Sequence, residues 1–165
     1  MLHRKDHNMD EGRKLVEDFF KDRGIEKRIL DYGETTHDSF HAAKAIGVEI
    51  GQIAKSILFM ADGKPVLVIL SGDERVDMKA LKKSLGAKKL KFAGEKDVTE
   101  HTGFGVGAVS PVGLPSEVRI FLDRSLKKFE TIYPAAGGTN TMFESTFEEL
   151  KDLTGALEAD LSQKV

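Results

Sequence analysis

A lysine at the start of an apolar run is the side chain best placed for chemistry in this sequence. Lys55 precedes Ile57–Met60, and alternate residues of a strand share a face. Both faces beyond Lys55 are apolar, so we predict a central strand with the ammonium at the edge of the core. There the ammonium can hold a phosphate or a carbonyl oxygen. In the alternative, its stem covers apolar surface and its charge reaches solvent.

A glycine-rich segment, Thr102–Gly113, is the second candidate. Its alternating glycines at 103, 105 and 107 let the backbone approach a ligand and expose N–H groups. A dinucleotide fingerprint needs a strand before it and a helix after it. Here a predicted helix precedes, and Ser110-Pro111 prevents a helix from following. We exclude a nucleotide cofactor, which leaves a binding loop or a plain glycine-rich turn.

A third segment, Tyr133–Asn140, contains the adjacent glycines Gly137 and Gly138 after a predicted strand. It is either a binding loop or a tight connection.

Metal and nucleophile chemistry have weaker support. The pairs His3/His7 and His37/His41 have helical spacing, but neither pair has a third ligand nearby. Since the chain has no cysteine, thiolate metal sites, disulfides and cysteine nucleophiles are excluded. Ser110 lacks the glycine elbow of a serine hydrolase. We expect no metal and no cofactor.

The helices and strands that position these segments are predicted from hydrophobic periodicity and from the capping residues and glycines at their ends. Asp10, Asp77 and Thr146 are predicted helix caps, and glycines end the helices. The turn 61–64 predicts a hairpin. The predicted helices are 10–23, 39–46, 78–85, 95–102 and 147–154, and the predicted strands are 28–32, 56–60, 66–70, 89–92, around 109, 118–122, 129–133 and 141–144. This mixed order indicates an α/β or α+β domain rather than a βαβ repeat.

The bulk composition sets the class of protein. The 165 residues suit one domain, and 40% hydrophobic with 32% charged residues is typical of a globular chain. We expect a flexible leader over 1–10, the domain over 11–156 and a tail over 157–165. No apolar run suits a membrane span, and the amino-terminal residues are too polar for a signal peptide, so we expect a cytoplasmic protein. A net charge of −2 argues against DNA binding. A solvated helix face explains most clusters such as the lysines at 79–91, and a local phosphate-binding patch is the alternative.

The three segments together resemble the signature of the YbaK family. They match in order, spacing and residue type over Gly51–Ser56, Thr102–Gly113 and Phe129–Gly138, and the similarity extends over residues 11 to 156. This domain also occurs inserted in bacterial prolyl-tRNA synthetases.

The resemblance implies a single compact α/β domain with a mixed, barrel-like β-sheet surrounded by helices. It implies an enzyme, an aminoacyl-tRNA deacylase that hydrolyses mischarged tRNA in trans. The family lysine corresponds to Lys55, which would hold the tRNA 3′ end, so the expected catalytic residues are Lys55 and Gly107. The expected substrate-binding residues are Gly105, Ala108, Ser110, Pro111, Ala136, Gly137 and Gly138. The expected partners are the tRNA acceptor end and, as a candidate, prolyl-tRNA synthetase.

Two departures concern the amino acid removed. Family members that clear cysteine from tRNA-Pro carry a serine before the glycine pair and an acid a few positions later. Here Ala136 precedes the pair, and Glu144 matches the acid only in a shifted register. Alanine or another small amino acid therefore suits the motif as well as cysteine. The alternative function is a non-catalytic tRNA-end or nucleotide-binding module acting with an aminoacyl-tRNA synthetase.

Overall fold

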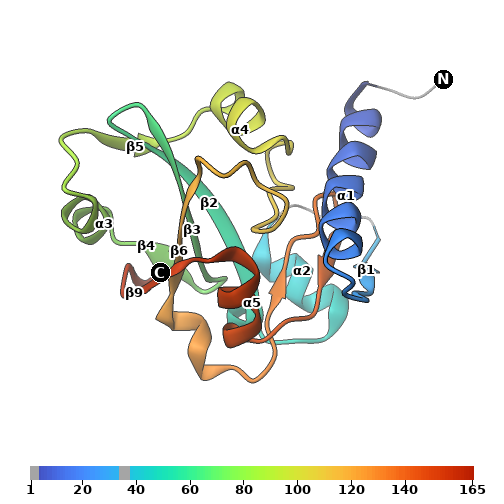
Figure 1. The fold of residues 1–165 in the computed structure, drawn as a ribbon. Coiled ribbons are helices and arrows are strands. Elements are labelled where there is room, and N and C mark those ends of the chain that lie inside the picture. The colour runs from blue at the N-terminus through green and yellow to red at the C-terminus, as the bar shows by residue number, and fades with distance from the viewer. Residues whose placement is uncertain (1–3, 34–37) are drawn as a thin grey trace.

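The structure, a computed structural model, describes residues 4–33 and 38–165 (Figure 1). In these ranges helices and short strands alternate irregularly along the chain, as the sequence predicts. The helices are α1 (Arg4–Asp22), α2 (Ser39–Ile46), α3 (Met78–Leu85), α4 (Glu95–Thr102) and α5 (Phe147–Thr154), with short 3-10 helices η1 (Ile50–Gln52) and η2 (Arg124–Lys128). The strands are β1 (Ile29–Asp31), β2 (Ile53–Ala61), β3 (Lys64–Ser71), β4 (Glu74–Val76), β5 (Leu90–Phe92), β6 (Arg119–Asp123), β7 (Tyr133–Pro134), β8 (Thr141–Phe143), β9 (Leu157–Ala159) and β10 (Ser162–Lys164).

The central element is the antiparallel hairpin of β2 and β3. Its turn residues Asp62 and Gly63 have φ of 49° and 80°, the conformation that favours a two-residue hairpin turn. The hairpin lies inside a mixed sheet of order β5-β2-β3-β6-β9, in which β6 runs parallel to β3, and β9 parallel to β6. The prediction of a barrel-like sheet is wrong. The described sheet is open, because its edge strands β5 and β9 have three residues each and pair only inward.

One edge of β2 is covered discontinuously. On the side away from β3, the parallel strand β7 pairs with Ile53 and Ala54, and the antiparallel strand β5 pairs with Phe59–Ala61. The Leu58 carbonyl accepts a hydrogen bond from the Ala93 N–H at 3.0 Å, so the stretch Lys55–Ile57 lies in a gap between two short strands. This gap is where a ligand can reach the backbone and side chains of a central strand.

The two faces of β2 belong to two hydrophobic clusters, as the alternation predicts. Ala54 and Leu58 pack with residues of α1, α4 and α5, whereas Phe59 packs with Leu81 of α3. Figure 1 accordingly shows α1 and α3 on opposite sides of the long strands. Lys55 shares its face with Phe59, so it stands at the edge of the α3 cluster.

Helix ends agree closely with the sequence prediction, with one exception. Asp38, Asp77 and Thr146 accept hydrogen bonds from backbone N–H groups in the first turns of α2, α3 and α5. Helix α1, by contrast, begins at Arg4 and not near Asp10, so most of the predicted leader is helical backbone. No helix in the described ranges has the length and apolarity needed to cross a bilayer.

Two other predictions need correction. No strand forms around Val109, because the buried segment 108–110 is held by turns and not by a ladder: the Ala108 N–H bonds to the Gly105 carbonyl, and the Val112 N–H to the Ser110 hydroxyl. The expected tail forms strands β9 and β10 instead. Buried Asp123 fixes this segment by accepting hydrogen bonds from the Leu161 N–H at 2.6 Å and the Ser162 hydroxyl at 2.7 Å.

Helix α1 and the double-glycine turn are in direct backbone contact. A Cβ placed on Gly12 would overlap the Gly137 carbonyl oxygen, and a Cβ on Gly137 would overlap that of Gly12. Gly137 also has a φ of 88°, which disfavours any other residue. The two glycines therefore allow an approach between helix and turn that side chains would block.

Glu158 on β9 holds three cations at the carboxyl-terminal end of the domain. Its carboxylate contacts Arg124 Nε at 2.6 Å, Lys151 Nζ at 3.2 Å and Lys127 Nζ at 3.3 Å. Hydrogen bonds from Arg124 and then Lys151 lower the pKa of Glu158 from 4.5 to about 2.

We expect Glu158→Gln to lower the melting temperature near neutral pH but not in strong acid. Because the pKa is depressed in the folded state, the stabilisation is present above pH 4.5 and is lost as the pH falls towards 2. Melting curves from pH 7 to 2 should show parent and variant converging over that interval. Glu117→Gln, at an exposed loop position, is the control. A constant difference between parent and Glu158→Gln at every pH would contradict this role.

Candidate functional site

A small cavity opens at the gap in the edge of β2. It has a volume of about 150 Å³, and we call it the β2 cavity. Its walls come from the start of β2, the amino-terminal end of α2, the glycine-rich loop after α4, and the segments around β7 and β8. The lining residues are Tyr32, Asp38, Ser39, Ala42, Ile53, Ala54, Lys55, Ser56, Gly107, Val109, Tyr133, Ala135 and Met142.

Two opposite charges face this cavity. Among its described lining residues, only Lys55 is cationic and only Asp38 is anionic. Lys55 is half-buried, and burial lowers the pKa of its ammonium, although the nearby carboxylates of Asp73 and Glu74 oppose this effect. Within the described ranges, no hydrogen bond or ion pair holds its Nζ. The ammonium is therefore available to an anionic ligand.

Hydroxyl groups supply the remaining polar atoms. The Ser56 Oγ is buried without a hydrogen-bond partner among the described residues, an arrangement that costs about 1–3 kcal/mol unless a ligand or water satisfies it. The two tyrosines of the chain, Tyr32 and Tyr133, both line the cavity. Burial raises the pKa of each phenol, reinforced by Asp31 for Tyr32 and by Glu144 for Tyr133. Both therefore stay protonated near neutral pH.

The glycine-rich loop brings a backbone donor to the cavity. Gly107 is exposed, lines the cavity and has a φ of 84°, which an L side chain rarely adopts. The neighbouring Ala108 N–H is engaged with the Gly105 carbonyl at 3.1 Å. The Gly107 N–H donates to no residue that the structure describes, so it can serve a ligand oxygen.

The structure brings together only part of the predicted site. Lys55 and Gly107 line the same cavity although 52 positions separate them in the sequence. The predicted substrate-binding residues Gly105, Ala108, Ser110, Pro111, Ala136, Gly137 and Gly138 are not among its lining residues. Ala136 is buried in the core, and Gly137 contacts α1. Direct contact of these residues with substrate stays a prediction.

The sequence interpretation did not assign several residues that the fold places here. Ser56 directly follows Lys55, but adjacent strand residues point to opposite faces, and only the edge gap brings both to one cavity. Asp38 was not singled out, although its position before a predicted helix was a signal of a capping residue. It accepts hydrogen bonds from the His41 N–H and faces His41 Nδ1 at 2.7 Å.

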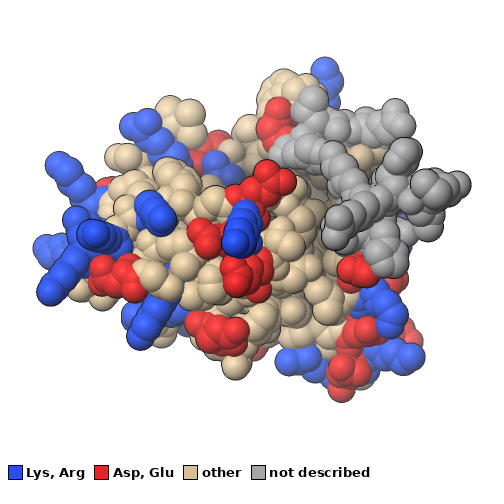
Figure 2. Space-filling model, turned by 90° about the horizontal axis from the view of Figure 1, so that it is seen from above, with Lys and Arg blue, Asp and Glu red and all other residues tan. Residues whose placement is uncertain are grey.

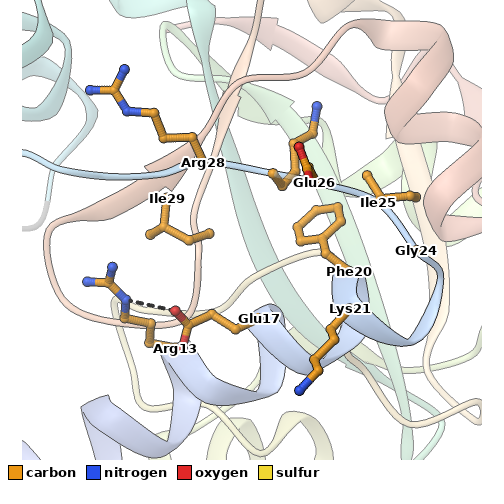
Figure 3. A pocket seen from close by; sticks show the side chains of 10 residues that line it. Arg13, Glu17, Phe20, Lys21, Gly24, Ile25, Glu26, Arg28 and Ile29 are labelled. Atoms are coloured by element: carbon orange, nitrogen blue, oxygen red, sulfur yellow. Dashed lines mark ion pairs between the residues drawn. The ribbon is translucent and has the colours of Figure 1, made fainter.

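A larger hollow between α1 and residues 24–29 has a different character (Figure 3). Its volume is about 870 Å³, and it contains none of the predicted site residues. Figure 3 shows the Arg13 guanidinium directed at the Glu17 carboxylate, 3.6 Å away. Lys27, another lining residue, is paired with Glu149 at 2.6 Å. Because two of its cations are paired and none of the predicted site residues lines it, we assign the chemistry to the β2 cavity.

Only some of the candidate metal ligands lie among the described residues. His3 and His37 lie outside the described residues. In the described ranges, the ligand atoms of Asp97, Glu100 and His101 lie within 4.8 Å of one another on α4, and these three residues do not line the β2 cavity.

We expect chelator treatment to have no effect on the deacylation that the family resemblance implies, because no metal-binding group of that cluster lines the β2 cavity. The measurement is the deacylation assay described below, with and without EDTA. Loss of activity that added zinc restores would contradict this expectation.

Comparison with known proteins identifies the family. A family model described as the aminoacyl-tRNA editing domain matches residues 34–153. The chain belongs to the aminoacyl-tRNA editing domain family. The resemblance to YbaK-type proteins is thereby confirmed.

Relatives of this editing domain cover most of the chain. YwhH of Bacillus subtilis (strain 168), whose function is uncharacterised, is 33% identical over 142 residues, which are 86% of this chain and 90% of YwhH. EbsC of Enterococcus faecalis (strain ATCC 700802 / V583), named as a candidate Cys-tRNA(Pro)/Cys-tRNA(Cys) deacylase, is 28% identical over 74% of this chain and 75% of EbsC.

A solved structure supports the fold. The crystal structure of a candidate trans-editing enzyme for prolyl tRNA synthetase superimposes with a TM-score of 0.86 and 32% identity, over 92% of this chain and 97% of that one. The editing-domain fold therefore includes the open mixed sheet and the helices described above.

Proposed function

We propose that this editing domain hydrolyses, in trans and in the cytoplasm, the ester between a small wrong amino acid and tRNA, with tRNA-Pro as the expected tRNA. The observation that carries the proposal is the β2 cavity, where one ammonium, one carboxylate and several hydroxyls surround a space of about 150 Å³. An aminoacyl-tRNA end presents the complementary groups, which are a phosphate, an α-ammonium and an ester carbonyl.

The charges suggest how the substrate lies. Lys55 binds a phosphate of the terminal nucleotide as a compact point charge. Asp38 then attracts the α-ammonium of the amino acid, and the Ser56 Oγ is available to the ester or to an attacking water. Pockets for drug-sized ligands usually measure about 300–1,000 Å³. The smaller β2 cavity therefore favours a small aminoacyl group.

The reaction needs no covalent intermediate with the protein. The oxygen of a bound water attacks the ester carbonyl carbon, and negative charge develops on the carbonyl oxygen. The Gly107 N–H is placed to stabilise that charge. The bond from the carbonyl carbon to the ribose oxygen then breaks, the proton of the water passes to this leaving oxygen, and a free amino acid and tRNA result. Positioning supplies much of the rate.

The relatives and the residues around the double-glycine turn bear on which amino acid the domain removes. EbsC is named for cysteine on tRNA-Pro or tRNA-Cys, but its identity to this chain is 28%. In this chain Ala136 is fully buried, and Glu144 accepts a hydrogen bond from the Tyr133 phenol at 3.3 Å. We therefore place alanine and cysteine together as the expected substrates.

A panel of mischarged tRNAs tests the proposal. We expect single-turnover deacylation of Ala-tRNA-Pro or Cys-tRNA-Pro, and no deacylation of correctly charged Pro-tRNA-Pro above the spontaneous rate. If no member of the panel is deacylated although the protein binds tRNA, the chain is the non-catalytic tRNA-end module. Repeating the panel with prolyl-tRNA synthetase present shows whether that enzyme is a partner, as the likeness to the trans-editing structure suggests.

A further inference from the structure

A second groove begins where the β2 cavity ends, because Lys55 lines both. This groove has a volume of about 690 Å³ and lies between β4, the start of α3 and β5. We call it the basic groove, and its charged and aromatic lining residues are Lys55, Arg75, Asp77, Lys79 and Phe92. A strand bound by Lys55 in the cavity would therefore continue into this groove.

Two cations of the basic groove, Arg75 and Lys79, have no partner among the residues that the structure describes. Arg75 and Lys79 are exposed, and neither forms an ion pair or side-chain hydrogen bond with a described residue. Asp77 is the acidic residue of the groove, but its carboxylate caps α3 by accepting a hydrogen bond from the Ala80 N–H at 3.1 Å. With three cations and one carboxylate among its lining residues, the groove presents a net positive charge.

Phe92 adds an exposed aromatic surface at the same place. Its side chain is 61% exposed, which is unusual for phenylalanine. One side of the ring packs on the buried Phe59, with centroids 4.8 Å apart, so the ring is held in place while its other side remains open. An aromatic ring beside free cations is the combination with which proteins bind single-stranded nucleic acid.

The charge of the molecule is concentrated near this groove. Residues 75–92 contain seven Lys and Arg and one acid, whereas the rest of the chain has eighteen Lys and Arg against twenty-six Asp and Glu. Figure 2 shows Lys and Arg gathered at the end of the molecule where α3 and β5 lie. A polyanion approaching this mildly acidic protein is thus directed to the basic groove.

We propose that the basic groove binds the single-stranded 3′ end of an RNA, with Arg75 and Lys79 on its phosphates and a base stacked on Phe92. The inference rests on the proposed function for the identity of the RNA, and it specifies the path by which the tRNA end leaves the β2 cavity. An acidic peptide would use the same cations but would gain nothing from the aromatic ring.

Binding of uncharged RNA tests the inference without any hydrolysis. The probe is a labelled single-stranded RNA of about eight nucleotides ending in CCA, a length typical of single-strand sites. We expect the double variant Arg75→Ala/Lys79→Ala to weaken binding about tenfold and to lower the salt slope by about 1.4, since each phosphate contact contributes about 0.7. Phe92→Leu keeps an apolar contact with Phe59 but should weaken binding about tenfold with an unchanged salt slope. Phe92→Tyr should restore it.

Lys14→Ala is the matched control, because it removes an exposed lysine from α1, on the opposite side of the molecule. The inference is overturned if the groove variants bind RNA as Lys14→Ala does, or if polyglutamate binds the parent as tightly as the RNA and with the same dependence on Phe92. A substrate without the strand, an aminoacyl ester of adenosine, should be hydrolysed equally by parent and groove variants. If the parent hydrolyses no ester while RNA binding depends on the groove, the proposed function fails and this inference stands.

Discussion

Lys55→Ala should lower the efficiency of deacylation about ten- to a hundredfold while the protein still folds. The ammonium is half-buried, and no described residue pairs with it, so its removal costs the domain few contacts. If it holds a phosphate of the substrate, alanine removes a charge-assisted contact worth roughly 1.5–3 kcal/mol, which gives that loss of efficiency. The measurement is kcat/KM on a mischarged tRNA-Pro, with melting curves for both proteins.

Two further variants define what Lys55 contributes. Lys55→Arg should be partly active at best, since a planar guanidinium does not replace a compact ammonium in a small cavity. Lys14→Ala removes a lysine from α1 and should behave as the parent. A folded Lys55→Ala protein with parental efficiency would remove this residue from the mechanism. The proposal would then depend on the glycine-rich loop alone.

Gly107→Val should abolish deacylation with a moderate loss of stability. Gly107 lines the β2 cavity, and its N–H is the backbone donor available to the ester, so a branched side chain there occupies space and moves the donor. A displacement of about 1 Å can by itself cost about a hundredfold in rate. Because φ is 84°, we expect backbone strain of ~1–2 kcal/mol as well. Single-turnover deacylation and melting curves measure the two effects separately.

A second glycine with a positive φ gives a control for the strain. Gly63, in the turn between β2 and β3, has a φ of 80°, and a Cβ placed on it meets no atom within 4 Å, so Gly63→Val carries similar strain away from the cavity. We expect Gly63→Val to stay active. Equal loss of activity in Gly63→Val and Gly107→Val would attribute the defect to stability and not to the site.

Local signals determined which elements could be predicted from the sequence. Asp77 and Gly86 delimit α3 by capping chemistry that depends on the residues themselves, and the bounds of this helix were correct. Strands β4, β7, β9 and β10, of two or three residues each, were missed or misplaced because no local sequence pattern marks them. Such short strands depend on partners distant in sequence, including Ser162 opposite Val76, and no periodicity reveals these.

The site was predictable to the extent that its residues belong to recognisable motifs. Lys55 and Gly107 were placed by the spacing of those motifs, and the fold brings them to one cavity. Asp38 and Ser56 were not assigned to the site from the sequence. Their role depends on a gap between β5 and β7, and only pairing across the sheet creates this gap. Turn chemistry alone does not distinguish a substrate loop from a packing contact at Gly137.

The backbone contact of Gly12 with Gly137 indicates that the folded domain begins before the segment matched by the family model. The family model matches residues 34–153, so helix α1 lies before it, yet Val16 and Phe20 of that helix are buried in the same core as Phe143. A domain graft that started at residue 34 would leave an uncovered aromatic surface above the double-glycine turn. For engineering, the cooperative unit of this fold therefore begins earlier than the segment by which the family is recognised.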